Sequence, residues 1–156
     1  VRRFPCIGGI EAVALVEESG TDELPPGTTV ILHGYGLGVD RDGGLSPWVR
    51  VPGAFATALP DGMTALEAAA IGVAGHTVAM SIDLMELNGL APGKGPVAVT
   101  GATGGTGSLA VSMLSGLGHE VVAVSRKPDD GFLRGLGAAE VIAVPEGRGK
   151  PLDSAR

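Results

Sequence analysis

The pattern of apolar and polar positions changes character near residue 60. Before that point, short valine-rich runs are separated by turns rich in glycine and proline, a pattern typical of β-strands. We expect strands within residues 11–18, 28–34, 46–51 and 55–60. Several short strands separated by such turns indicate part of a β-barrel or sandwich.

A helical pattern begins after residue 60. Thr64 and Glu67 have the spacing of a capping box, in which each side chain bonds the backbone N–H of the other, so we expect a helix to begin there. Gly72 and Gly75 are expected to interrupt this helix, because glycine is a poor helix former. The helical run that follows places three large apolar side chains on one face, namely Met80, Leu84 and Leu87.

From residue 96 onward, short apolar runs alternate with helical segments. The runs at residues 96–101, 120–125 and 139–145 have the length and composition of buried parallel strands. The segments between them have helical spacing, and Pro128 marks the start of the second. A βαβαβ order with short connections forms a parallel sheet, because such crossovers are right-handed. The chain is therefore predicted to be an α/β protein.

The strongest chemical signal lies where the first of these strands meets its helix. Ala102, Gly104 and Gly107 occupy the three positions of a G-x-G-x-x-G fingerprint, with alanine at the first. The motif follows a buried strand and opens a helix within a βαβ unit, which is the context of a dinucleotide site. Small residues let the backbone approach a pyrophosphate, and the helix N-terminus presents free N–H groups to it. The alternative is a tight turn whose glycines serve packing only.

The end of the second strand indicates which dinucleotide is bound. An acidic residue about 20 positions after the glycine motif would bind the ribose hydroxyls of NAD. This chain has Ser125, Arg126 and Lys127 at that place instead. Two cations and a hydroxyl suit the 2′-phosphate of NADP, so we expect NADP, as NADPH, to be the cofactor. The alternative is an ordinary solvated basic turn.

Composition narrows the classes of function. The chain has 156 residues, 44% of them apolar, and a net charge of −6 without a basic patch, which argues against nucleic acid or an anionic membrane as a partner. No uninterrupted run of 18 apolar residues occurs, so no membrane span is expected. The single cysteine, Cys6, allows no intrachain disulfide, and a reducing, cytoplasmic location is expected. The three histidines are dispersed, and His119 is expected at the surface.

Together, these residues resemble the zinc-independent medium-chain dehydrogenase/reductase superfamily, and within it the acrylyl-CoA reductase branch of quinone-oxidoreductase-like proteins. The resemblance covers nearly the whole chain in the right order. It implies a partial GroES-like β-barrel segment over residues 1–60, followed over residues 61–156 by the first βαβαβ half of a Rossmann parallel sheet. The segments that carry it are residues 4–16, 34–53, 58–82 and 95–108.

The resemblance implies an NADPH-dependent oxidoreductase that reduces an activated C=C bond of a small-molecule substrate, such as acrylyl-CoA, another enoyl thioester or a quinone. Thr77 would lie near the nicotinamide ribose. The full-length form is expected to be a homo-oligomer, and no catalytic proton donor is assigned. The residues expected to hold the pyrophosphate are Ala102, Thr103, Gly104, Gly105, Thr106 and Gly107, and those expected to hold the 2′-phosphate are Ser125, Arg126 and Lys127.

Compared with this family, the chain is expected to be a fragment that has no reductase activity alone. The N-terminal part of the GroES-like domain, with its substrate-facing polar residues, has no counterpart in it, nor has the second half of the Rossmann domain. His76 stands where the branch often has an aromatic residue, which changes the expected shape of the nicotinamide-facing pocket.

Two other functions stay open. The chain could be a catalytically inactive remnant or a nucleotide-binding module, because half a Rossmann fold retains the adenosine side. A short-chain dehydrogenase is less favoured. Residues 99–107 also fit the glycine motif of that family, but the motif should begin the chain and precede a Tyr-x-x-x-Lys, whereas the single tyrosine, Tyr35, lies upstream.

We predict that the purified protein holds no zinc. Zinc-dependent relatives carry Gly-His-Glu where this chain has Gly9, Ile10 and Glu11, and isoleucine has no lone pair to offer a metal. Elemental analysis, after loosely bound metal has been removed, should find far less than one zinc per chain. A stoichiometric zinc would mean that this segment is misaligned.

Overall fold

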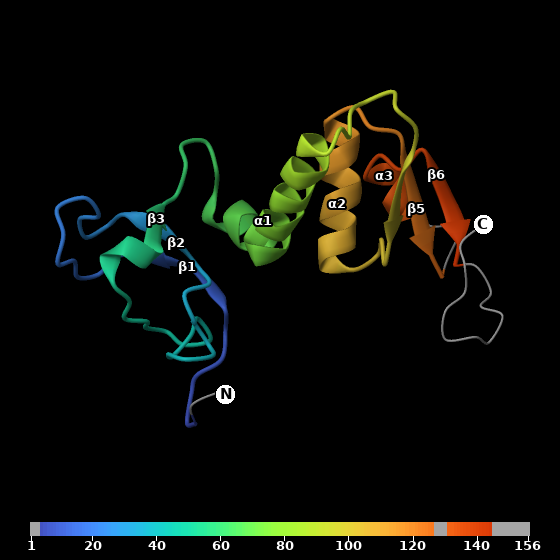
Figure 1. Ribbon diagram of the computed structural model, residues 1–156. Helices are drawn as coiled ribbons and strands as arrows, with labels where there is room; N and C mark the ends of the chain where they lie inside the picture. Colours follow the sequence, from blue (N-terminus) through green and yellow to red (C-terminus); the bar gives the residue numbers. More distant parts are fainter. Residues whose placement is uncertain (1–3, 127–130, 145–156) are drawn as a thin grey trace. The chain divides into compact units, whose positions relative to one another are not determined.

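The computed structural model describes residues 4–126 and 131–144 (Figure 1). The chain divides into two compact units, Val1–His76 and Thr77–Arg156, and each contains one three-stranded sheet. The division between them falls along the chain within the long helix α1 (Ala65–Leu87). The boundary predicted at residue 60 separates the GroES-like segment from the Rossmann half, whereas this division is between compact units. The predicted boundary therefore stays a prediction.

An antiparallel sheet organises the first unit, with its second strand in the centre. Val30 and Leu32 alternate with outward-facing residues along that central strand and are buried, together with Leu37 from the loop that follows. Three of the four predicted strands are confirmed, each shorter than expected. The elements are β1 (Glu11–Leu15), β2 (Thr29–His33), a short 3-10 helix η1 (Gly53–Phe55) and β3 (Ala56–Ala58).

Residues 46–51 form no strand, so that prediction is wrong. Pro47 has no N–H group to donate to a neighbouring strand. The hydroxyl of Ser46 accepts a hydrogen bond from the N–H of Trp48 at 3.3 Å, which closes a local turn instead. The valines that gave this stretch its apolar pattern, Val49 and Val51, pack against the first unit's core without pairing with another strand.

Glycines let two segments of the first unit touch backbone to backbone. The N–H groups of Gly43 and Gly44 donate to the carbonyls of Ile7 and Gly9 at 2.9 and 3.0 Å. A Cβ atom on Gly43 would overlap the carbonyl oxygen of Gly9 and lie 2.6 Å from that of Gly8. The loop after β2 therefore seats against the segment before β1 only because no side chain stands between them.

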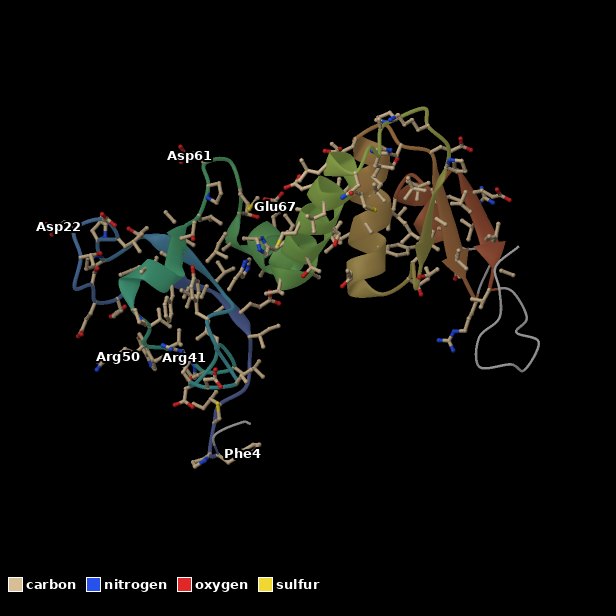
Figure 2. The ribbon with its side chains drawn as sticks, in the orientation of Figure 1. Phe4, Asp22, Arg41, Arg50, Asp61 and Glu67 are labelled. Carbon is tan, nitrogen blue, oxygen red and sulfur yellow. The ribbon has the colours of Figure 1, made fainter. Side chains whose placement is uncertain are left out.

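The predicted capping box begins helix α1. The N–H of Thr64 donates to a carboxylate oxygen of Glu67 at 2.8 Å, and the N–H of Glu67 donates to the Thr64 hydroxyl at 3.2 Å. Figure 2 shows Glu67 at this end of the helix. The bond from the Thr64 backbone, with a second from its hydroxyl, holds the pKa of Glu67 below its ordinary value. The start of the helix is therefore confirmed.

Helix α1 breaks at one of the two glycines that the sequence singles out. Gly72 has φ 50° and ψ −158°, far from helical values, whereas Gly75 is helical and buried. After the break, Val78 and Ile82 are buried in the core of the second unit. The face formed by Met80, Leu84 and Leu87 is exposed, with exposed fractions of 54, 60 and 83%.

By length and composition alone, α1 could cross a membrane. It has 23 residues, and an 18-residue window within it has a mean hydropathy of 1.4. A single helix of this kind is weak evidence for a membrane span, because the core helix of a soluble protein can have the same length and hydropathy. The expectation of no membrane span rested on the lack of an uninterrupted apolar run, a stricter criterion, and it stays a prediction.

The second unit is the predicted βαβαβ arrangement around a parallel sheet. The strands lie in the order β4-β5-β6, and the register aligns Val99, Ala123 and Val141, all of them buried. Figure 1 shows α2 lying against this sheet, and its Val111 and Leu114 pack into the same core. The elements are β4 (Val97–Thr100), α2 (Gly105–Gly116), β5 (Val121–Ser125), α3 (Gly131–Gly135) and β6 (Glu140–Ala143). Lys127 and the predicted helix start at Pro128 lie outside the described residues.

His119 is buried, contrary to the expectation of a surface position. It is 5% exposed, and neither ring nitrogen has a hydrogen-bond partner among the described residues. The chain reverses after α2 through Gly118 (φ 85°), and the N–H of His119 donates to the carbonyl of Leu114 at 3.0 Å. This turn carries the imidazole inward, which polar character alone does not predict.

We predict that Gly43→Ala destabilises the first unit by about 1–3 kcal/mol, because the new methyl group forces two backbone segments apart. Gly20→Ala is the matched control: a Cβ there meets nothing within 4 Å, so the change should stay within about 0.5 kcal/mol. Urea unfolding of the three proteins measures both changes. Equal midpoints for Gly43→Ala and the parent would contradict the close contact.

Candidate functional site

The candidate site is the loop that joins β4 to α2. The chain leaves the sheet after Thr100, turns at Gly101 (φ 61°), and closes on itself where the N–H of Gly104 donates to the carbonyl of Gly101 at 2.9 Å. Ala102 is fully buried in this turn, whereas Thr103 is exposed. The small residue at the first position of the motif therefore anchors the loop, and its polar neighbour faces solvent.

Three consecutive N–H groups at the start of α2 are left without acceptors. The N–H of Ser108 is the first to bond, to the carbonyl of Gly104 at 2.8 Å. Within the described residues, those of Gly105, Thr106 and Gly107 have no hydrogen-bond acceptor, and no side chain caps the helix. Twelve helical residues align their dipoles behind them, so this exposed end carries positive potential. The arrangement is suited to an anion such as phosphate.

The glycines of the motif serve two different purposes. A Cβ on Gly107 would overlap the carbonyl oxygen of Gly101 and lie 2.8 Å from the Cα of Ala102, so this glycine lets α2 pack closely on the strand end. A Cβ on Gly105 would meet nothing within 4 Å. Close packing therefore explains why residue 107 is a glycine, but it does not explain Gly105. The missing side chain of Gly105 instead leaves the N–H groups at the start of α2 accessible.

The neighbouring strand ends beside this loop. In the parallel register Thr100 lies opposite Val124, so the loop after β4 and the residues after β5 leave the sheet at the same edge. Ser125 is only 4% exposed, whereas Arg126 is exposed. Of the three predicted 2′-phosphate residues, Arg126 is the one that the structure places on the surface, and Lys127 lies outside the described residues.

Thr77 lies on α1, in the helical segment that follows the break at Gly72. The N–H of Val73, the residue after this break, donates to the Glu11 carboxylate of β1. A Cβ on Gly72 would lie 2.6 Å from that carboxylate, so glycine and glutamate fit as a pair. Sequence reasoning missed Glu11, because the contact joins residues 62 positions apart. The one local signal was the glycine within a helical pattern.

Two histidines lie near this carboxylate. The Nε2 of His33 is 3.9 Å from the Glu11 carboxylate, and the rings of His33 and His76 are 6.2 Å apart. Over residues 4–126 and 131–144, no group of three His, Cys, Asp or Glu side chains is placed to hold a metal ion. Glu11 and the two histidines therefore form a polar cluster beside the break in α1.

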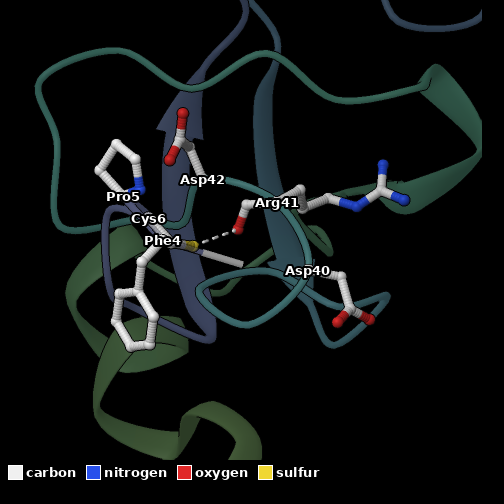
Figure 3. Close-up of a pocket in the computed structure, with 6 residues that line it drawn as sticks. All are labelled: Phe4, Pro5, Cys6, Asp40, Arg41 and Asp42. Atoms are coloured by element: carbon white, nitrogen blue, oxygen red, sulfur yellow. Dashed lines mark hydrogen bonds between the residues drawn. The ribbon is translucent and has the colours of Figure 1, made fainter. Parts of the chain in front are cut away.

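The first unit also contains a pocket of about 430 Å³ (Figure 3). The Cys6 thiol donates to the carbonyl of Arg41 at 3.3 Å, which ties the segment before β1 to the loop after β2. Its lining is mixed in charge and contains no convergent catalytic set. The residues that line it are Phe4, Pro5, Cys6, Asp40, Arg41 and Asp42.

Comparison with known proteins identifies relatives along nearly the whole chain, although no protein-family model matches it. The chain is 48% identical, over 92% of its length, to YhfP of Bacillus subtilis, a protein named for quinone oxidoreductase activity. It is 39% identical, over 99% of its length, to the acrylyl-CoA reductase AcuI of Ruegeria pomeroyi. The chain spans about half the length of these relatives, 44% and 48% respectively.

Solved structures agree in fold. The yhdH oxidoreductase of Salmonella enterica, crystallised in complex with NADP, is 40% identical, with a TM-score of 0.86 over 92% of this chain and 44% of that one. The Bacillus subtilis protein yhfP, crystallised with NAD bound, is 46% identical, with a TM-score of 0.85 over the same shares. The expected fold, a GroES-like segment followed by half a Rossmann sheet, is confirmed by these neighbours.

Proposed function

Because the chain belongs to the medium-chain dehydrogenase/reductase family, we propose that it forms part of an NADPH-dependent oxidoreductase that reduces an activated C=C bond. The observation that carries this proposal is the exposed end of α2, where the N–H groups of Gly105, Thr106 and Gly107 have no acceptor in the described chain. Free N–H groups at a helix N-terminus are suited to bind an anion such as phosphate.

The cofactor pyrophosphate would be held by the loop between β4 and α2. Its oxygens accept hydrogen bonds from the free N–H groups, and the absence of side chains at Gly104 and Gly105 lets them come close. Thr103 and Thr106 are exposed beside these amides and add hydroxyl donors. The set is Ala102, Thr103, Gly104, Gly105, Thr106 and Gly107.

The 2′-phosphate of the cofactor would be bound at the end of β5. Arg126 supplies an exposed guanidinium there, and we assign Lys127 to the same group from the sequence. Ser125 is buried, so its part is to shape the strand end beside these cations more than to offer an open hydroxyl. One similar protein was crystallised with NADP and another with NAD, and the cations after β5 favour NADP for this chain.

The reaction proposed is the reduction of an enoyl thioester such as acrylyl-CoA, or of a quinone-like substrate. When bound, the cofactor supplies a hydride, and a carbonyl conjugated to the C=C bond makes the β-carbon electrophilic. Thr77 would lie beside the nicotinamide ribose, and no residue of this chain is assigned as proton donor. We place the protein in the cytoplasm, with a small molecule as its substrate, and its full-length form as a homo-oligomer.

A second candidate is a nucleotide-binding module without catalysis. The observation that favours it is the span of the chain, about half of its relatives, which includes the adenosine-side βαβαβ unit. Both candidates need the same phosphate site. They differ in whether bound NADPH is oxidised.

We predict that the chain binds NADPH at least about tenfold more tightly than NADH, because a charge-assisted contact to the 2′-phosphate contributes about 1.5–3 kcal/mol. Arg126→Gln should remove most of this preference, whereas Arg134→Gln, an exposed arginine on α3, should leave it unchanged. Calorimetric titration of the three proteins with both cofactors measures the ratios. Equal affinity for the two cofactors in the parent would rule the assignment out.

We predict that the 156-residue chain does not oxidise NADPH with either substrate, whereas a protein extended to the full length of its relatives does. Hydride transfer needs reacting atoms held about 3–3.5 Å apart, and groups from both halves of a doubly wound sheet define that geometry. NADPH oxidation is followed with acrylyl-CoA and with a simple quinone for both proteins. Comparable rates would show that the remaining segments are dispensable and that the fragment interpretation is wrong.

A further inference from the structure

An aromatic residue in the first unit is held in an unfavourable backbone conformation. Tyr35 has φ 49°, between Gly34 at 69° and Gly36 at 77°, and it is the one non-glycine residue with positive φ among those described. Glycine adopts these angles freely, whereas a bulky side chain does so at a cost in free energy. Such an outlier directs attention to what its side chain does.

The ring of Tyr35 stacks on Phe55. Their centroids are 4.1 Å apart and their planes differ by 4°, and the guanidinium carbon of Arg41 lies 4.8 Å from the Phe55 centroid. The three side chains come from the loop after β2 and from η1, so the turn at Tyr35 brings its ring onto a residue 20 positions away. We call this set the Tyr35 stack.

The Tyr35 stack is open to solvent. Tyr35 is 59% exposed although one face of its ring lies on Phe55, so the other face is available. No carboxylate lies within ion-pair distance of Arg41 in the described part of the chain. Of the two acids that flank Arg41 in sequence, Asp42 accepts a hydrogen bond from the N–H of Ile7 at 2.8 Å, and Asp40 forms no ion pair with Arg41.

The backbone that carries Arg41 is fixed before any ligand arrives. Its N–H donates to the carbonyl of Gly36 at 3.2 Å, and its carbonyl accepts from the N–H of Gly38 at 2.9 Å and from the Cys6 thiol. Figure 3 shows its guanidinium extending away from Cys6 and Asp42. Arg50 is a second exposed arginine of the same unit (Figure 2). The open face of Tyr35 and a guanidinium without an ion-pair partner in the described residues are therefore both presented next to Phe55.

We propose that the Tyr35 stack binds the adenine ring and the 3′-phosphate of a coenzyme A thioester. Adenine stacks on an open aromatic face, and a phosphate monoester pairs with a guanidinium that has no other anion. This inference rests on the proposed reductase function and favours a thioester as substrate. A simple quinone could cover the Tyr35 ring but has no anionic group for Arg41.

Calorimetric titration with adenosine 3′,5′-bisphosphate, the nucleotide end of coenzyme A, tests this site on the 156-residue chain. Tyr35→Gly keeps the backbone conformation, since glycine prefers it, but removes the stacking surface. Arg41→Gln keeps a polar hydrogen-bonding side chain but removes the charge. Each should weaken binding at least about fivefold. Trp48→Ala, which removes an exposed aromatic outside the Tyr35 stack, should leave the affinity within about twofold.

Adenosine 2′,5′-bisphosphate, the matching part of NADP, separates this proposal from the proposed cofactor site. Its affinity should not change in Tyr35→Gly or Arg41→Gln, because it belongs to the proposed cofactor site, which is formed by the loop before α2 and the end of β5. If the 3′-phosphate nucleotide fails to bind, or binds both variants as it binds the parent, the Tyr35 stack is not a coenzyme A site. If the 2′-phosphate nucleotide alone fails to bind, the cofactor assignment falls and the Tyr35 stack stands.

Discussion

The close approach of helix α2 to the end of strand β4 is the constraint on which the candidate site depends. Gly107 has no Cβ, and only for that reason can the helix begin directly against Gly101 and Ala102. Beginning there, the helix has no capping side chain, and its first three N–H groups have no acceptor among the described residues. A charge at such an end is stabilised by about 0.3–1 kcal/mol from the dipole alone, to which each hydrogen bond adds.

Contacts between distant segments support the rest of the structure in a similar way. The Glu11 carboxylate of β1 accepts a hydrogen bond from the N–H of Val73, which directly follows the break in α1 at Gly72, so a strand side chain supports the helix where it breaks. In the loop after β2, glycines remove side chains where two backbones meet, and the space gained is used by hydrogen bonds between them. In both places the glycine is required by a contact with a residue that is distant in the sequence.

Local spacing carried the successful sequence predictions. The Thr64–Glu67 capping box, the βαβαβ order and the glycine motif each depend on residues a few positions apart, and each is found where expected. The failures involve tertiary context. The valines of residues 46–51 pack without pairing, and His119 is turned inward by the reversal after α2. The Tyr35–Phe55 stack joins a strained turn to a short helix, and no periodicity encodes it.

The central claim is that the free amides at the start of α2 bind the phosphates of the cofactor. Amide NMR spectra of the ¹⁵N-labelled chain, recorded while NADPH is added, test it directly. Hydrogen bonding to phosphate should move the Gly105, Thr106 and Gly107 signals most, with smaller changes around Arg126 and none along β1 and β2. Saturable binding that leaves these three signals in place would contradict the account, because the phosphates would then lie elsewhere.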